Sequence, residues 1–319
     1  MGSKPLIGID LGGTKTAVAA ITQDGRILAR TQLPTGGHGS AEAFMAALVA
    51  RVREVLAGAE PAAIGIGASG PLDLARGTIH NPYTLPLPDG TDIVTPFRQA
   101  FAVPVALEND ADAAALGEHW RGAAQGYELA VCLTFGTGVG GGVVLKGRVF
   151  RGAGGVHPEI GHMPVDPSGP ECYCGVRGCL EAMASGTAIG QAGLEAAQGR
   201  SGAALLSLAG GRAEMVRAEH VFAAARAGDA AAGEIIGRAV RAAADAVFGL
   251  VHTLAPDAMV LGGGVMRHYD LFEPAVRDAL KRCVLVPGSG VLLAPAQLGN
   301  DAGVLGAARA AALLLQQQG

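Results

Sequence analysis

Four side chains suited to binding a metal ion lie close together in the middle of the sequence. A histidine is followed ten residues later by a short segment with three cysteines, which gives the set His162, Cys172, Cys174 and Cys179. One imidazole and three thiolates favour tetrahedral Zn²⁺, and four protein ligands leave no open position for a catalytic water. Where no secretion signal is expected, such a cluster indicates metal ligands rather than disulfides. We predict a structural zinc site here, with reduced core cysteines as the alternative.

A second candidate is the polar trio Glu108, Asn109 and Asp110, which lies between an expected strand at 103–107 and an expected alanine-rich helix ending near Trp120. Ligands of α/β proteins bind outside the carboxyl ends of such strands. A carboxylate there accepts the proton of an alcohol as the alcohol attacks phosphorus, and a neighbouring amide orients the alcohol. We therefore predict Asp110 as a general base beside Asn109. The alternative is that one of these two residues only caps the helix, and both roles can hold if different residues take them.

Two glycine-rich turns, each directly after an apolar run, suit the binding of a phosphorylated ligand. The first turn holds Asp10, Gly12, Gly13, Thr14 and Lys15, and the second holds Gly136, Thr137 and Gly138. Glycine lets the backbone wrap a phosphate, whose oxygens accept from exposed NH groups and threonine hydroxyls. The carboxylate of Asp10 suits Mg²⁺, which keeps much of its hydration shell. We predict that both turns bind ATP with Mg²⁺; a plain hairpin turn with an exposed acid is the alternative.

A third glycine-rich segment, Gly65–Gly70, fits the dinucleotide-binding pattern G-x-G-x-x-G after an expected strand at 62–68. Pro71 follows it, and no acidic residue ends a second strand about twenty residues further on, as a dinucleotide site requires. We therefore reject a nicotinamide site.

The expected secondary structure repeats itself at the scale of a domain. A strand, a glycine-rich turn, a second strand, a tight turn and a third strand occur at 6–11, 16–21 and 26–33, and again at 129–135, 140–145 and from 148 onward. Such a duplication predicts an α/β fold of two similar halves with a cleft between them. The other expected elements are a strand at 258–261 and helices at 44–55, 218–232, 235–254 and 302–315. We expect the last helix to pack on the first half.

The length and composition are those of a two-domain protein that binds neither nucleic acid nor membrane. The 319 residues carry a formal charge of −4, only 4% aromatic residues and no basic block, which argues against a nucleic-acid surface. No apolar stretch is long enough to span a bilayer, and the first strand follows Met1–Lys4 without a signal peptide. We expect a cytoplasmic protein with an N-terminal domain at 1–118 plus about 300–319 and a C-terminal domain at 119–299.

Six motifs, in this order along the chain, resemble those of the ROK family (repressors, open reading frames and kinases). They are DLGGTK at 10–15, ENDA at 108–111, TFGTGVGGG at 134–142, PEIGH at 158–162, CYCGVRGCLE at 172–181 and LGGG at 261–264. The resemblance implies the duplicated actin-like ATPase (ribonuclease H-like) fold and ATP-dependent transfer of phosphate to the 6-hydroxyl of glucose. It also implies a homo-oligomer, dimeric or tetrameric.

The resemblance also assigns residues. It implies that Asp110 is the catalytic base and that His162, Cys172, Cys174 and Cys179 are zinc ligands. It places Gly12, Thr14, Thr137, Gly262 and Gly263 in the phosphate and adenosine segments. The sugar-contacting residues that it implies are Asn81, Asn109, Asp110, Glu159, His162 and Glu181.

Two departures from the family pattern bear on the substrate. Asp112 stands where the family commonly has asparagine, and we expect its side chain on the helix surface. His157 and Pro158 replace a pair of small residues that is frequent in glucose kinases, and a His-Pro pair resembles fructose-preferring relatives. His157 is either a competing metal ligand or a residue of the loop structure, and we expect the second. The alternatives to glucose are therefore fructose, N-acetylglucosamine and N-acetylmannosamine, and a sugar-sensing regulator without a DNA-binding domain is a further alternative.

Overall fold

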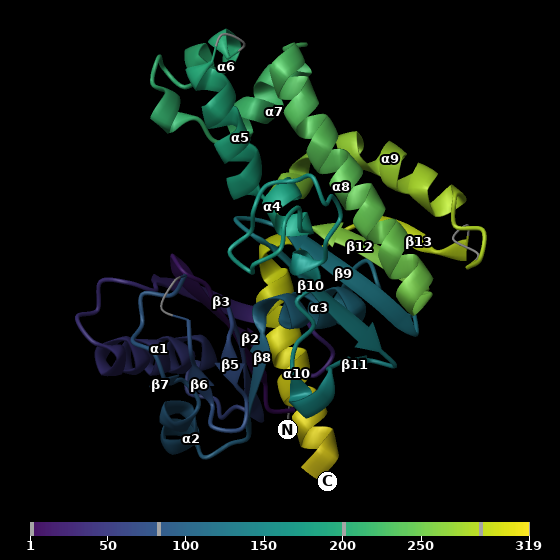
Figure 1. Cartoon of the computed structure of the whole chain (residues 1–319). Coiled ribbons are helices and arrows are strands. Elements are labelled where there is room, and N and C mark those ends of the chain that lie inside the picture. Colours follow the sequence, from purple (N-terminus) through teal and green to yellow (C-terminus); the bar gives the residue numbers. More distant parts are fainter. Residues whose placement is uncertain (1–2, 82–83, 200–201, 287–289, 319) are drawn as a thin grey trace. The chain divides into compact units, whose positions relative to one another are not determined.

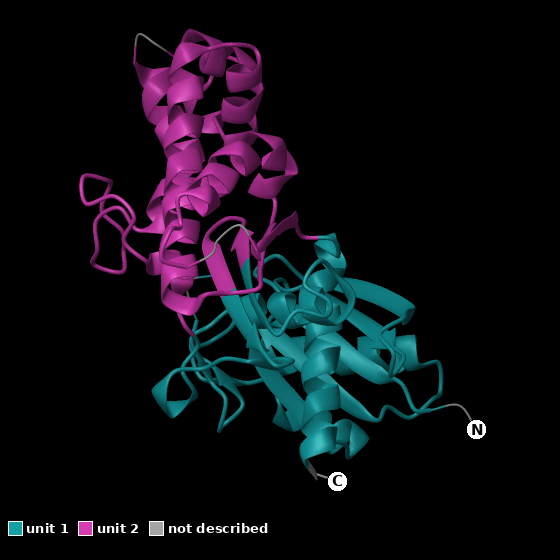
Figure 2. Ribbon diagram, turned by 90° about the vertical axis from the view of Figure 1, so that its right-hand side faces the viewer, with its two compact units in different colours: residues 1–132, 142–157, 297–319 teal, residues 133–141, 158–296 magenta. Residues whose placement is uncertain are grey.

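Two five-stranded sheets with matching strand order form the framework of the protein (Figure 1). The computed structural model describes residues 3–81, 84–199, 202–286 and 290–318. It divides into two compact units, shown in Figure 2: unit 1 contains residues 1–132, 142–157 and 297–319, and unit 2 contains residues 133–141 and 158–296. The chain passes between the units at four places. Two lie within neighbouring strands of the second sheet, β9 (Leu129–Phe135) and β10 (Val139–Leu145), and the others follow His157 and Ala296.

The first sheet has the strand order β3-β2-β1-β4-β8. Strand β2 is antiparallel to β1 and β3, whereas β4 is parallel to both β1 and β8. The carboxyl ends of β1, β4 and β8 therefore lie at one edge, and the polar residues that end or follow these strands come together there. The strands are β1 (Leu6–Leu11), β2 (Lys15–Ile21), β3 (Ile27–Pro34), β4 (Ala63–Ala68) and β8 (Val105–Asn109).

Helices cover both faces of this sheet because its strands are apolar on both sides. On one face Ile7, Ile9 and Val18 form a core with α1 (Ala41–Leu56), whose buried residues include Phe44. On the other face alternate strand residues pack on α10 (Ala302–Gln318), which also packs on α3 (Asp110–Arg121). The expectation that the last helix packs on the first half is confirmed.

Glycines in β1 and β4 allow α10 to lie close to the sheet. A Cβ atom on Gly8 would lie 1.9 Å from the Val304 carbonyl oxygen, and one on Gly65 would lie 1.7 Å from that of Ala307. Such distances exclude any side chain at these positions. Packing therefore explains the first glycine of the G-x-G-x-x-G pattern, Gly65, without a dinucleotide.

The second sheet has the order β11-β10-β9-β12-β13, which repeats the order of the first sheet. Strands β12 (Ala258–Gly262) and β13 (Leu292–Pro295) are parallel, and β11 (Arg148–Val149) is a two-residue partner of β10. A small third sheet contains β5 (Leu72–Asp73), β6 (Thr78–Ile79) and β7 (Thr91–Asp92), and α2 (Thr95–Phe101) follows it.

Unit 2 contributes most of the remaining helices. They are α4 (Leu180–Ala184), α5 (Gly186–Gln198), α6 (Ala203–Leu208), α7 (Ala218–Arg226), α8 (Ala230–Leu254) and α9 (Tyr269–Lys281). Short 3₁₀ turns lie at Ala153–Gly155, Ile160–His162, Ala213–Met215, Val265–His268 and Gly299–Asp301. Within the described ranges, no helix combines the length and the apolar character needed to cross a membrane.

The expectation of one helix at 218–232 is wrong. The helix ends at Arg226, Gly228 adopts a φ of 88°, and a new helix begins at Ala230. The Asp229 side chain caps this second helix by accepting a hydrogen bond from the Ala232 NH group. The glycine and the capping aspartate are ordinary helix stop and start signals, but the surrounding alanines concealed them.

Candidate active site

The trio after β8 divides the capping role and the candidate catalytic role between two residues. The Asn109 side chain caps α3, since its Oδ1 atom accepts from the NH groups of Ala111 at 2.8 Å and Asp112 at 3.4 Å. Asp110 is the first residue of the helix, and its Oδ2 atom accepts a hydrogen bond of 2.5 Å from the Ser69 hydroxyl. A serine donor orients the carboxylate, so Asp110 has the setting of a positioned base.

Ser69 is a candidate site residue that sequence reasoning missed. It directly follows β4, and the register aligns Ala68 of β4 with Asn109 of β8. Parallel neighbours end at the same edge of a sheet, so the residues following them meet. The available signal was this topology, whereas the segment was considered only as a dinucleotide motif.

Asn81, the first of the predicted sugar-contacting residues, is buried in unit 1. Its Nδ2 atom donates to the Gly70 carbonyl and to the Thr84 hydroxyl, both at 2.6 Å, and its Oδ1 atom accepts from the Thr84 NH group at 3.0 Å. These bonds tie the loop after β4 to the segment at Thr84. A Cβ atom on Gly13 would lie 2.3 Å from the Thr84 carbonyl oxygen, so the same segment supports the first glycine turn.

Asp10 in that first turn is a carboxyl group in an unfavourable environment. Burial, and then the negative charge of Asp110, raises the pKa of Asp10 from 3.8 to about 6, while Arg30 and Lys15 oppose the shift. A Cβ atom on Gly303 of α10 would lie 2.6 Å from Cγ of Asp10, so the helix closes over the carboxyl group. Two neighbouring carboxylates in a partly buried place suit a divalent cation, whose charge offsets their repulsion.

The second glycine turn is held by unit 2 through its backbone. The Gly136 carbonyl accepts from the Gly186 NH group at 2.8 Å, and the Thr137 carbonyl accepts from the Thr187 NH group at 3.4 Å, so the turn lies at the start of α5. Gly263, with a φ of 91°, lies so close that a Cβ atom would be 2.4 Å from the Phe135 carbonyl oxygen. Glycine is required there, since an L side chain rarely adopts this φ.

Glu181, a predicted sugar-contacting residue, is bound to this second turn. Its Oε2 atom accepts from the Val139 NH group at 2.9 Å, and a Cβ atom on Gly138 would lie 2.3 Å from that same oxygen. Gly161, two residues after Glu159, packs equally closely on the Val139 carbonyl. The turn, the Glu159 segment and Glu181 therefore form one packed group in unit 2.

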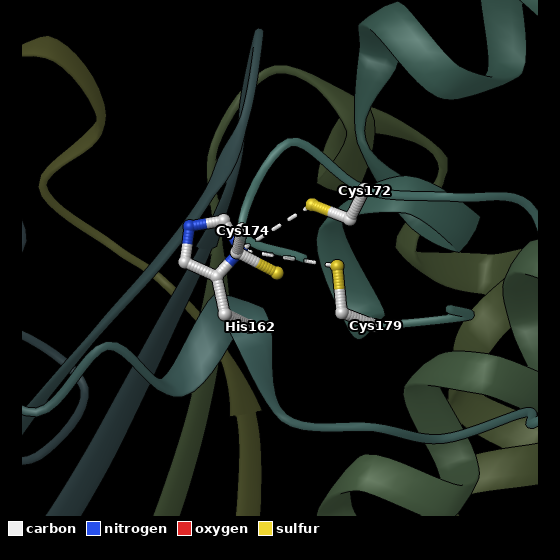
Figure 3. A group of neighbouring side chains, drawn as sticks. All are labelled: His162, Cys172, Cys174 and Cys179. Carbon is white, nitrogen blue, oxygen red and sulfur yellow. Dashed lines mark hydrogen bonds between the residues drawn. The ribbon is translucent and has the colours of Figure 1, made fainter. Parts of the chain in front are cut away.

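The four predicted metal ligands converge in unit 2 (Figure 3). Their ligand atoms all lie within 4.8 Å of one another, and the Nδ1 atom of His162 is 3.6 Å from Sγ of Cys172 and 3.8 Å from Sγ of Cys179. Around tetrahedral Zn²⁺, with Zn–S of about 2.3 Å and Zn–N of about 2.0 Å, ligand atoms lie roughly 3.5–3.8 Å apart. The set fits a tetrahedral metal ion. His157 is not part of this group.

His157 instead binds Asp112, and the expectation that Asp112 lies on the helix surface is wrong. The Asp112 side chain is 1% exposed, and its Oδ2 atom lies 2.9 Å from Nδ1 of His157. Beside this pair, Arg151 donates to the Glu108 carboxylate. Burial raises the pKa of Glu108, Arg151 opposes the shift, and the Asp112 charge adds to it. The Arg151–Glu108 ion pair and the His157–Asp112 contact thus hold the segment 151–157 to the residues on either side of Asn109 and Asp110.

The predicted site residues fall into two groups, one in each unit. Unit 1 holds the first turn with Asp10, Gly12, Gly13, Thr14 and Lys15, together with Asn81, Asn109 and Asp110. Unit 2 holds Gly136, Thr137, Gly138, Glu159, His162, Cys172, Cys174, Cys179, Glu181, Gly262 and Gly263. Lys15 is exposed at the start of β2, in keeping with a side chain that reaches a ligand.

Known proteins resemble this chain over nearly its whole length. The profile of the ROK family matches residues 6–316. A glucokinase of Thermotoga maritima is 37% identical over 304 residues, which cover 95% of this chain and 96% of the relative.

Two solved structures extend the comparison to the fold. The ROK hexokinase of Thermus thermophilus superposes with a TM-score of 0.83 at 37% identity, covering 98% of this chain and 99% of the other. A ROK family glucokinase of Streptomyces griseus, in complex with glucose and AMPPNP, gives 0.78 at 34% identity, covering 99% and 100%. The duplicated strand order is therefore that of the actin-like ATPase fold of sugar kinases, and this chain belongs to the ROK family.

Proposed function

We propose that this chain is an ATP-dependent kinase that transfers the γ-phosphate of ATP to the 6-hydroxyl of glucose. The observation that carries the proposal is the arrangement of Asn109, Asp110 and Ser69. Asn109 caps the helix and Ser69 donates to the Asp110 carboxylate, which supports Asp110 as the proton acceptor. The similar glucokinases and the relative in complex with glucose and AMPPNP support the choice of substrates.

Asp110 acts as the general base in this proposal. As the sugar oxygen attacks the γ-phosphorus, its proton passes to the Asp110 carboxylate, the bond from phosphorus to the bridging oxygen of ADP breaks, and glucose 6-phosphate leaves. The Asp10 carboxylate would hold Mg²⁺ in this proposal, and the cation would supply positive charge against the phosphates. Most of the rate enhancement comes from positioning and electrostatics, because the phosphoryl transition state is loose.

Two sets of residues recognise the sugar and the nucleotide in this proposal. The residues that contact the sugar in this proposal are Asn81, Asn109, Asp110, Glu159, His162 and Glu181. The nucleotide is bound by the two glycine turns and by the segment with Gly262 and Gly263. The bonds from Val139 to Glu181 and from Ser69 to Asp110 support these roles, since they fix the carboxylates in place.

A coupled assay of ADP release with ATP and a panel of hexoses tests the proposal. We expect glucose to give the highest kcat/KM. A preparation that releases ADP with none of the sugars would refute the kinase assignment. Fructose is the second candidate, since the His157–Pro158 pair resembles fructose-preferring relatives and His157 binds the buried Asp112. A higher kcat/KM with fructose or with an N-acetylhexosamine would replace glucose as the substrate.

We also propose that the metal ion held by His162 and the three cysteines is structural Zn²⁺. The thiolate-rich donor set and the separations near 3.6–3.8 Å support zinc. Metal analysis is expected to give one Zn²⁺ per chain. The Cys174→Ser variant is expected to lose the metal with little disturbance of packing, because Cys174 is exposed, whereas Cys283→Ser, outside the cluster, keeps it. A fully active wild-type preparation without metal would contradict this assignment.

The remaining predictions concern assembly and location. We propose a dimer or tetramer in the cytoplasm without nucleic-acid or membrane partners, on the strength of the family resemblance and the formal charge of −4. Light scattering on the purified protein tests the oligomeric state. A retarded DNA fragment whose mobility depends on sugar would favour the regulator instead.

A further inference from the structure

Tyr173 lies between two of the metal-binding cysteines and has an unusual combination of exposure and contact. Its side chain is 85% exposed, yet its hydroxyl oxygen lies 3.2 Å from Nε2 of His162. The phenol ring stands edge-on to the imidazole, with centroids 5.1 Å apart and an interplanar angle of 84°. The tip of an otherwise exposed side chain is therefore anchored at the histidine that the proposed function assigns to the sugar.

The two nitrogen atoms of His162 serve different partners. Nδ1 lies beside the sulfur atoms of Cys172 and Cys179, and Figure 3 shows the other ring nitrogen pointing away from the sulfurs. With a metal ion on Nδ1, the proton resides on Nε2. Nε2–H then donates a hydrogen bond to the Tyr173 oxygen. The phenolic O–H group is free to donate a hydrogen bond to another acceptor.

Two carboxylates act on that phenolic group. Glu181 has the larger electrostatic effect on the Tyr173 hydroxyl group, and Glu159 has the smaller one. The Tyr173 hydroxyl group therefore lies close enough to both carboxylates to be affected by their charge. These are the two carboxylates that the proposed function assigns to sugar recognition.

The Tyr173 hydroxyl group accepts a hydrogen bond from an imidazole NH group and lies near carboxylates that can accept a hydrogen bond in turn. A sugar hydroxyl group at this place would have the same hydrogen-bonding pattern. We infer that the Tyr173 hydroxyl occupies the place of a sugar hydroxyl at His162, and that Tyr173 must swing away before the sugar binds. The inference rests on the proposed function of His162, Glu159 and Glu181. It makes Tyr173 a residue that sets sugar affinity without taking part in phosphate transfer.

The size of the effect follows from a two-state equilibrium. Apparent affinity is the intrinsic affinity multiplied by the fraction of molecules in which the site is open. The closed state is held by about one hydrogen bond with a net value near 1 kcal/mol, because most of the ring lies in solvent in any case. Tyr173 is thus expected to weaken apparent sugar binding about two- to tenfold.

The Tyr173→Phe variant tests this inference by removing the hydroxyl while keeping the ring. Calorimetric titration with glucose is expected to give a Kd two- to tenfold lower than that of the wild type, and KM for glucose is expected to fall by the same factor with kcat unchanged. Tyr173→Leu, which also lacks the hydroxyl, is expected to change Kd in the same direction. Tyr127→Phe is the matched control, since Tyr127 is neither in the metal-binding cluster nor among the proposed sugar-contacting residues, and its Kd is expected to equal that of the wild type.

The outcomes separate this inference from the proposed function. Metal content at the wild-type level in both Tyr173 variants establishes that the loop is intact. With the loop intact, an unchanged or higher Kd in the variants overturns the inference, and a higher Kd shows that the phenol binds the sugar. Failure of the wild-type protein to phosphorylate any hexose would instead overturn the proposed function itself.

Discussion

The two glycine-rich turns occupy the same place in the repeated strand order, but only the first contains a carboxyl group. The first turn joins β1 to β2 and contains Asp10, whose pKa is raised to about 6 by burial and then by Asp110. The second turn joins β9 to β10 and has glycine and threonine in place of a carboxyl group. The carboxylate beside the second turn belongs to Glu181, which accepts a hydrogen bond from the Val139 NH group.

Their supports differ in the same way. The first turn is braced by the Thr35 hydroxyl, which donates to the Gly12 carbonyl at 2.6 Å, and by α10 at Gly303. The second turn lies at the start of α5, where Gly186 and Thr187 donate to its carbonyl groups. The strand order is therefore repeated in the two sheets, whereas the side chains of the two turns differ. The first turn, with Asp10, suits a cation. The second turn offers backbone groups and the neighbouring Glu181 carboxylate for hydrogen bonding.

The largest expected effect on activity comes from removing the charge of Asp110, the carboxylate that neighbours Asp10 of the first turn. In Asp110→Asn the candidate base is lost, so we expect kcat with glucose and ATP to fall by about 10³-fold. The Kd for glucose is expected to stay within about threefold, since asparagine keeps hydrogen-bonding capacity. Steady-state kinetics and calorimetry check both values. Asp245→Asn, on the exposed face of α8, serves as the control, and a near-normal kcat in Asp110→Asn would remove the assigned base.

The Asp10→Asn variant is expected to gain stability while losing activity. The folded protein binds the Asp10 proton more tightly than the unfolded chain, since the pKa rises from 3.8 to about 6. The free energy of unfolding therefore decreases as pH rises through this interval, by about 3 kcal/mol in total. Asparagine carries no charge, so without nucleotide or Mg²⁺ the variant is expected to be more stable than the wild type at pH 8, by up to about 3 kcal/mol.

Urea unfolding at pH 4 and pH 8 measures this difference. The two proteins are expected to differ little at pH 4, where the folded-state carboxyl group is protonated, and most at pH 8. An equal or lower stability of Asp10→Asn at pH 8 would show that the Asp10 carboxylate is compensated in the folded protein. The first turn would then lose its distinction from the second.

The smallest expected effect concerns the second turn and compares two of its own glycines. In Gly138→Ala the new methyl group would lie 2.3 Å from Oε2 of Glu181, whereas in Gly136→Ala the nearest atom would be 4.0 Å away. Glu181 must move in the first variant, so we expect KM for glucose to rise about tenfold and kcat to change less. Gly136→Ala is expected to stay within about twofold of the wild type. Equal KM values in the two variants would separate Glu181 from sugar binding.

Strands bounded by glycine were predictable to within a residue or two. Leu6–Leu11 and Leu129–Phe135 were expected as the structure has them, because a continuous apolar run before a glycine turn fits a buried strand. The alanine-rich region after Ala218 was not, because alanine gives no contrast between a helix and the short break at Gly228. The burial of Asp112 was missed for another reason. Its partner His157 lies 45 residues away, beyond the reach of helical periodicity.

The sequence by itself determined the kinds of chemistry. His162 and the three cysteines are close in the chain and suit few roles other than metal ligation, and the glycine turns and Asp110 follow strands, where ligands bind. Tertiary structure alone decided which side chains meet: Ser69 with Asp110, His157 with Asp112, and Tyr173 with His162. The direction of a side chain depends on packing and on strand register between distant segments, and neither property is encoded in local spacing.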